Sequence, residues 1–196
     1  FSVELVTERA DLGSGLDTLT IGQPHLITAS ALLDLVSARW IESLVQQAGR
    51  AGAAVLFALT VDGRTGWNPP DEADAEVQRL FASHQRRDKG VGAALGPDAP
   101  AQLAKRLRRL GYRVRVAPSP WRLGTKHAPD AALAAALIDG WLRAALEQEP
   151  AASARLHAWH ARRRAALDDP AFVLTVGHVD LFACPRAGEP SCGGEA

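Results

Sequence analysis

The chain contains no methionine and only two cysteines, Cys184 and Cys192. A newly translated chain begins with methionine, so we expect further residues upstream of Phe1 in the natural protein. A disulfide between two cysteines close to one end of the chain would constrain only that end and would not form a disulfide framework. This small number favours a reducing compartment, and we expect a cytoplasmic protein.

Long apolar runs and an excess of charge of one sign are also absent. No stretch approaches the ~20 apolar residues that span a bilayer, so no membrane partner is predicted. The 22 basic residues balance 22 acidic ones, which leaves no overall field to attract nucleic acid. The motifs of a P-loop, a nucleophile elbow and a zinc site are missing as well. We therefore predict no metal site and disfavour a nucleoside triphosphatase, a serine hydrolase and a zinc enzyme.

The most informative segment that is present covers residues 25–64. "HLITAS" at 25–30 is apolar after its first residue, residues 31–49 carry apolar side chains at helical spacing, and "AAVLFALTV" at 53–61 is apolar again. Charge-free strands of this kind are typical of a parallel sheet with helices on both faces. Such sheets bind ligands at the carboxyl ends of their strands. The segments after Ser30 and after Val61 are therefore the first candidates for a site.

The remaining sequence predicts a single domain of alternating strands and helices. Strands are expected over 2–6 and 112–121, and a long strand or a hairpin over 172–184. Helices are expected over 72–85, 100–110, 130–149 and 152–167. A chain of 196 residues that is 47% hydrophobic is long enough to bury one core. We predict a domain over 1–187 with a helical lid insert at about 68–98, followed by a flexible tail over 188–196.

Three segments resemble a known family. They are "RADL" at 9–12, "LITASALLDLVS" at 26–37, and "HQRRDKGVGAALGP" at 84–97 together with "GYRVRVAPSPWRL" at 111–123. In these segments the chain resembles an uncharacterised bacterial subgroup of class I S-adenosylmethionine-dependent methyltransferases, over about residues 2–185. The resemblance implies S-adenosylmethionine as cofactor. It also implies a Rossmann-like sheet, mostly parallel with an antiparallel final strand. The family's glycine-rich turn and acidic strand end do not occur, so its N-terminal strands are expected before Phe1.

The resemblance also implies cofactor-binding residues. Asp11 would accept a hydrogen bond from the adenine amino group, and Leu12 would contact the ring. Ala29 and Ser30 would border the methionine part, with Leu33 packing beside it. Two alternatives stay open: Asp11 as a turn residue that bonds its own backbone, and Ser30 as the cap of the following helix.

Acceptor-binding and catalytic residues are expected after the second buried strand and in the lid. Asp62 or His84 would act as the base that takes the acceptor's proton. The substrate-binding candidates are cations suited to a carboxylate or phosphate, and one indole: Arg64, Arg86, Lys89 and Trp121. The alternatives are an ordinary "DG" turn at 62–63 and cations that favour a helix C-terminus. His178 is interpreted as a satisfied core histidine.

The predicted function is in-line transfer of a sulfonium methyl group to a small-molecule acceptor held close to the donor. The alternative is a non-catalytic methyltransferase-like module that binds a protein partner. A nicotinamide enzyme is disfavoured because its dinucleotide fingerprint is also missing. The sequence does not predict an oligomeric state.

Overall fold

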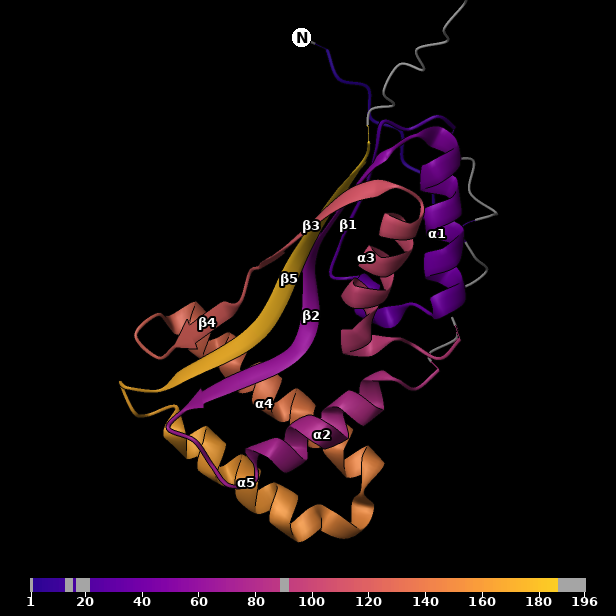
Figure 1. Ribbon diagram of the computed structural model, residues 1–196. Coiled ribbons are helices and arrows are strands. Elements are labelled where there is room, and N and C mark those ends of the chain that lie inside the picture. The colour runs from indigo at the N-terminus through magenta and orange to yellow at the C-terminus, as the bar shows by residue number, and fades with distance from the viewer. Residues whose placement is uncertain (1, 13–15, 17–21, 89–91, 187–196) are drawn as a thin grey trace, which may run out of the picture.

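A curled five-stranded sheet organises the protein (Figure 1). The computed structural model describes residues 2–12, 16, 22–88 and 92–186. The strands β1 (Leu26–Ser30), β2 (Ala54–Asn68), β5 (Val173–Pro185) and β3 (Tyr112–Pro118) lie side by side in that order. The short β4 (Trp121–Gly124) pairs with the first part of β5. The sheet therefore forms a half-barrel.

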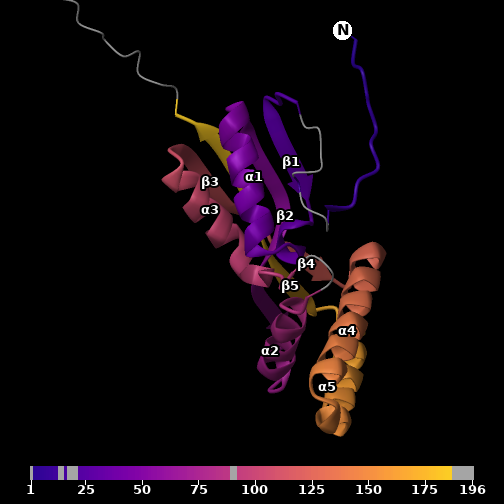
Figure 2. The ribbon, with the colours of Figure 1, turned by 90° about the vertical axis from the view of Figure 1, so that its right-hand side faces the viewer.

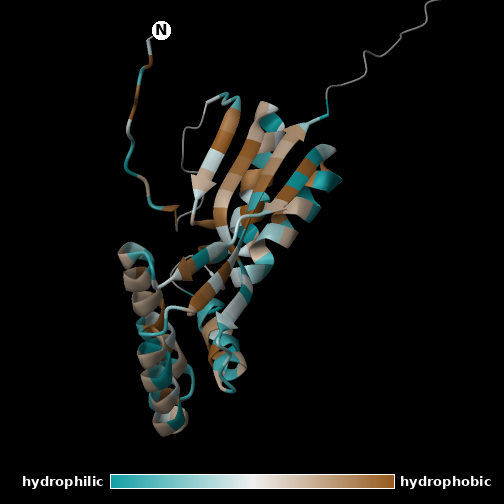
Figure 3. Ribbon diagram, turned by 90° about the vertical axis from the view of Figure 1, so that its left-hand side faces the viewer, coloured by the Kyte–Doolittle hydropathy of each residue, from teal (hydrophilic) through white to brown (hydrophobic). Residues whose placement is uncertain are grey.

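The predicted mostly parallel Rossmann-like sheet is wrong. Only β1 and β2 pair in parallel, whereas β5 runs antiparallel to β2, β3 and β4. The final strand lies between β2 and β3, and each pairing that it makes is antiparallel. Helices also fail to cover both faces in the upper half, where one face of the sheet carries no helix (Figure 3). Leu26 of β1 and Phe182 of β5 are 48% and 43% exposed. Residues 2–6 form no strand.

Helices α1 (Ala38–Ala51) and α3 (Ala99–Arg109) cover the other face of the upper sheet (Figure 2). Helix α1 begins later than predicted, because the 3-10 helix η3 (Leu33–Leu35) follows β1 and Ser37 provides the N-cap, accepting a hydrogen bond from the Trp40 amide at 3.3 Å. Ser30 is therefore not the cap. The first apolar core lies between these helices and the sheet, with Leu33, Ile41, Leu103 and Leu181 fully buried.

A second apolar core lies under the other end of the sheet. Helix α2 (Asp74–Gln85) packs on α4 (Ala128–Gln148), and α4 packs on α5 (Ser153–Ala166). The 3-10 helices η4 (Gly96–Asp98) and η5 (Pro150–Ala152) lead into α3 and α5. This core contains Ile138, Trp159, Phe172 and Leu174, all less than 2% exposed. The three helices form the lower layer seen in Figures 1 and 2.

A buried ion pair ties α5 to the start of α2. The guanidinium of Arg163, whose side chain is 2% exposed, donates hydrogen bonds to Asp74 and to the Pro69 carbonyl oxygen, and it lies 4.3 Å from the centre of the Trp67 ring. The indole N–H of Trp159 also donates to Asp74, at 2.9 Å. A buried charge is tolerated when it is paired and hydrogen-bonded in this way.

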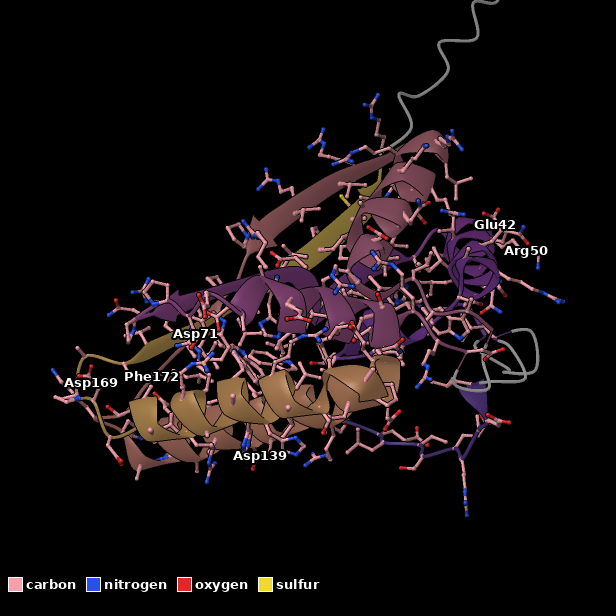
Figure 4. All side chains as sticks on the ribbon, turned by 90° about the horizontal axis from the view of Figure 1, so that it is seen from below. Glu42, Arg50, Asp71, Asp139, Asp169 and Phe172 are labelled. Atoms are coloured by element: carbon pink, nitrogen blue, oxygen red, sulfur yellow. The ribbon has the colours of Figure 1, made fainter. Side chains whose placement is uncertain are left out.

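A second, more exposed pair lies at the same end of α5. Both carboxylate oxygens of Asp71, labelled in Figure 4, accept hydrogen bonds from Arg162 at 2.6 and 2.9 Å. The hydrogen bonds from Arg162 lower the pKa of Asp71 to about 2, against a smaller opposing effect of burial.

The strands β2 and β5 extend through both cores and bend between them. Their register shifts between Phe57 and Thr60 and again between Val61 and Thr65. The predicted turn at 62–63 is part of this irregularity, and β2 continues to Asn68. Gly63 has a φ of 78° there, a conformation that glycine adopts at little cost. Such bulges redirect side chains, and they occur often beside binding sites.

Candidate functional site

A cavity of about 390 Å³ lies at this bend, between the two cores. Its wall is mainly apolar and combines η3, the bent parts of β2 and β5, helices α2 and α4, and β4. The residues that line it are Ala31, Asp34, Leu35, Leu59, Val61, Gly63, Arg64, Thr65, Gln78, Phe81, Ala82, Gln85, Trp121, Leu137, Trp141, Val176, Gly177 and His178. Its volume falls within the ~300–1,000 Å³ typical of small-molecule sites.

The close approach of β2 and β5 behind the cavity depends on Gly177. A Cβ atom at this position would overlap the carboxylate of Asp62 and lie 2.9 Å from the carbonyl oxygen of Arg64. Glycine leaves this space for the Asp62 side chain, which is only 12% exposed. Because residue 177 has no side chain, the Asp62 carboxylate can pack directly behind the cavity wall.

Both carboxylate oxygens of Asp62 accept hydrogen bonds from Arg64. One carboxylate oxygen accepts from the Arg64 amide at 2.9 Å, and the other accepts from Nε at 2.8 Å and from Nη2. Burial by itself raises the pKa of Asp62, but the hydrogen bonds from Arg64 outweigh burial and hold this pKa below its ordinary value. A carboxylate in this state is a weak proton acceptor.

Aromatic rings form much of the wall. Phe81 of α2 packs against Trp141 of α4 with ring centres 5.9 Å apart, and Trp67, behind the wall, meets Trp141 edge-on at 5.4 Å. Trp121 of β4 lies over the imidazole of His178 at 4.4 Å. Aromatic side chains supply large, stiff apolar surfaces for a planar ligand.

His178 is the most deeply buried polar group of the wall, at 3% exposure. Its Nδ1 atom lies 3.0 Å from the carbonyl oxygen of Val176. Because a carbonyl oxygen only accepts, Nδ1 is the donor in this contact. No described residue hydrogen-bonds Nε2.

The structure brings part of the predicted acceptor site together. Arg64 and Trp121 line the cavity, and Asp62 lies directly behind its wall. His84 and Arg86 are not in the wall. Nε2 of His84 lies 3.0 Å from Oε2 of Glu147, and Nη2 of Arg86 lies 3.0 Å from Oδ2 of Asp98. Lys89 lies outside the described residues.

The predicted cofactor residues are distributed differently. Leu12 and Ala29 are partly buried and pack against the first core, and Leu33 is wholly inside that core. The Leu33 side chain is therefore unavailable to a ligand in this structure. Asp11 and Ser30 are exposed. None of the five lines the cavity, although their neighbours Ala31, Asp34 and Leu35 do.

Sequence reasoning missed much of the cavity wall. The sequence predicts Phe81 only as part of an apolar helix face and does not indicate that Trp141 belongs to a site. His178 is buried, as the sequence predicts; the one signal that it also lines the cavity is its position as a histidine within an otherwise apolar strand. Whether a residue lines the cavity depends on which strands pair and where they bend, and the local periodicity of the sequence predicts neither.

Among the described residues, no three histidine, cysteine, aspartate or glutamate side chains gather in a way that could hold a metal ion. None of the helices in the described part of the chain has both the length and the apolar character required to cross a bilayer. No protein-family model matches the chain, and no curated protein matches it.

Proposed function

We propose that the protein transfers a methyl group from S-adenosylmethionine to a small, mainly apolar acceptor bound in the cavity. The observation that carries the proposal is the position of the cavity. Its wall includes Ala31, Asp34 and Leu35, which belong to the strand–helix junction "TASALLDL". That junction is the segment whose resemblance to class I methyltransferases implies contact with the methionine part of the cofactor.

The proposal assigns the adenine end of the cofactor to residues near the amino end of the chain. Asp11 presents an exposed carboxylate, which suits an adenine amino group, and Leu12 beside it is only partly buried. Ala29 and Ser30 place small side chains where β1 ends, so that a ligand can approach the backbone. Bound S-adenosylmethionine would supply an electrophilic methyl group on a positively charged sulfur.

The residues of the cavity exclude water and orient the acceptor. Phe81, Trp121 and Trp141 provide flat apolar surfaces, and Arg64 places one cation at the wall. Holding the acceptor in one orientation supplies much of the rate of a transfer reaction. A dry cavity also favours a step in which the charge on sulfur is lost. The proposal includes a cytoplasmic location, for which the scarcity of cysteine is the support.

Calorimetric titration with S-adenosylhomocysteine tests the cofactor part of the proposal. We expect micromolar binding to the natural protein, including any residues upstream of Phe1, and weaker binding to its Asp11→Asn variant, which keeps the shape of the side chain but not its charge. Asp168→Asn is the matched control, because Asp168 is exposed near the end of α5, and it should bind as the parent does. Absence of binding to the parent chain would refute the proposal and favour the non-catalytic module.

A further inference from the structure

We propose that two copies of this chain associate by exchanging one extended segment each. The segment covers residues 2–8, "SVELVTE", and in the partner copy it adds a strand to the free edge of β3. The inference concerns an interaction surface, and it rests neither on the cavity nor on the proposed function. It gives a partner to residues 2–6, which have the alternation of a strand but form none within one copy.

The segment exposes apolar side chains that a paired strand would bury. Val3, Leu5 and Val6 are 71%, 90% and 86% exposed, more than any other large apolar side chain among the described residues. Figures 2 and 3 show this part of the chain standing clear of the sheet, on the side of β1. Leu12, by contrast, packs against the first core and anchors the segment to the domain. Three exposed apolar side chains within four residues form a contiguous surface, which is typical of a contact site.

The edge of β3 offers a place for an added strand. β3 and β1 form the two edges of the sheet, as Figure 2 shows. Among the described residues, β5 is the only strand that pairs with β3, so one row of its backbone N–H and C=O groups lacks a strand partner. Val116 on this strand is 43% exposed. An open edge of this kind accepts a further strand through main-chain hydrogen bonds.

The charges of the segment and of the edge are opposite. Arg113 and Arg115 are exposed and lie on the same face of β3, because side chains alternate along a strand. Glu4 and Glu8 lie on one face of an extended segment for the same reason. No ion pair among the described residues includes any of these four side chains. Opposite charges on neighbouring strands stabilise their pairing and like charges oppose it, so the arginines select an acidic strand over others.

The apolar side chains match in the same arrangement. When the two glutamates lie beside the two arginines, Val3 and Leu5 fall on the opposite face of the added strand. There they lie beside Val114 and Val116 of β3. Val114 already packs against the first core, so the added strand extends the apolar surface of that core. A shift of the pairing by one residue would put the glutamates beside the valines and lose both matches.

The position of the segment favours pairing between copies. It precedes β1, and β2 and β5 lie between β1 and β3. Adjacent strands are ~4.8 Å apart, so the segment would have to cross ~14 Å of its own sheet before it could pair with its own β3. A second copy can present its β3 edge where the segment already lies. Two copies that exchange their segments form the same contact twice, which closes a dimer with two-fold symmetry.

The mass of the natural protein in solution, including any residues upstream of Phe1, tests the association. We expect a dimer at micromolar concentrations and a monomer for Leu5→Asp, which puts a charge into the apolar contact. Arg113→Glu/Arg115→Glu should raise the Kd of the dimer by at least ~10-fold, because attraction becomes repulsion in both contacts. Arg122→Glu, which changes an exposed arginine on β4, is the matched control and should dimerise as the parent does. All of these side chains are exposed, so each variant should stay folded, which circular dichroism checks.

A mixture of two variants distinguishes segment exchange from any other interface. Leu5→Asp has a defective segment and an intact β3 edge, and Arg113→Glu/Arg115→Glu has the reverse. A mixed pair therefore keeps one intact contact, and we expect the mixture to associate more tightly than either variant alone and less tightly than the parent.

Three results would overturn the inference. The first is a monomeric parent, which includes the case of a segment that pairs with its own β3 or with residues upstream. The second is an unchanged dimer in both variants. The third is a mixture that associates no better than its components.

Discussion

Replacing Asp74 by alanine should destabilise the protein strongly. Asp74 accepts hydrogen bonds from the Trp159 indole, from the Asp71 amide and from two nitrogens of Arg163. Its loss leaves the Arg163 guanidinium, 2% exposed, with the Pro69 carbonyl oxygen as its hydrogen-bond acceptor and the face of Trp67 beside it. Removing one partner of a buried ion pair costs about 3–5 kcal/mol, which is a large share of the ~5–15 kcal/mol that stabilises an ordinary domain.

Urea unfolding provides the measurement. With an m-value of about 2 kcal/mol/M, a loss of about 4 kcal/mol lowers the midpoint by about 2 M. Asp74→Asn keeps one side-chain oxygen and should lose about half as much. The double variant Asp74→Ala/Arg163→Met removes the stranded charge and should be more stable than Asp74→Ala alone.

The exposed Asp168 provides the control, and Asp168→Ala should change the midpoint by less than about 0.3 M. A midpoint for Asp74→Ala as close as this to the parent's would refute the reasoning, because it would mean that Arg163 does not depend on Asp74. The same would follow if the double variant were less stable than Asp74→Ala.

Three further predictions concern the cavity and the lower layer. Gly177→Ala should cost about 1–3 kcal/mol, because its Cβ displaces the Asp62 carboxylate; urea unfolding checks this, and a neutral effect would contradict the packing of β2 on β5. Thr65→Val should raise stability by about 1 kcal/mol, since the buried Thr65 hydroxyl has no partner among the described residues; a loss of stability would show that the hydroxyl is bonded. The Asp71–Arg162 pair lowers the pKa of Asp71 to about 2, so its contribution to stability is complete above the ordinary aspartate pKa of about 3.9 and is lost as the pH falls towards 2. Arg162→Gln should therefore flatten the pH dependence of the urea midpoint between about pH 4 and 2, and an unchanged slope would contradict the pairing.

The helices predicted from the sequence agree closely with those of the structure, because helical spacing is a local property of the sequence. The expected helix over 72–85 is α2 (Asp74–Gln85), and the one over 100–110 is α3 (Ala99–Arg109). Helix α1 is the instructive exception. Apolar periodicity begins before residue 37, but the Ser37 hydroxyl oxygen accepts a hydrogen bond from the Trp40 amide and caps the helix there.

The sheet could not be predicted in the same way. The apolar strand over 53–61 does occur as part of β2, but a charge-free run does not say which strand will lie beside it. β5 inserts between β2 and β3, and this insertion makes the sheet mostly antiparallel. The segment over 2–6 has the alternation of a strand, but among the described residues no strand lies beside it to pair with its backbone.

For the candidate site, the sequence predicted Arg64, which follows an expected strand, and Trp121, which ends one, and both line the cavity. It could not identify His178 or Trp141, since their roles depend on pairing between segments more than 100 residues apart and on packing between layers.

The sequence by itself determined where the chain is helical, which stretches are apolar enough to be strands, and that no charge excess is available for nucleic acid. Only the tertiary structure decided the strand order, the bend that opens the cavity, and the orientation of His178. The physical reason is the distance along the sequence between the residues that interact. Helical hydrogen bonds join residues four apart and leave a periodic pattern, whereas strand pairing and bulges are settled by the packing of distant segments, which leaves no local pattern to read.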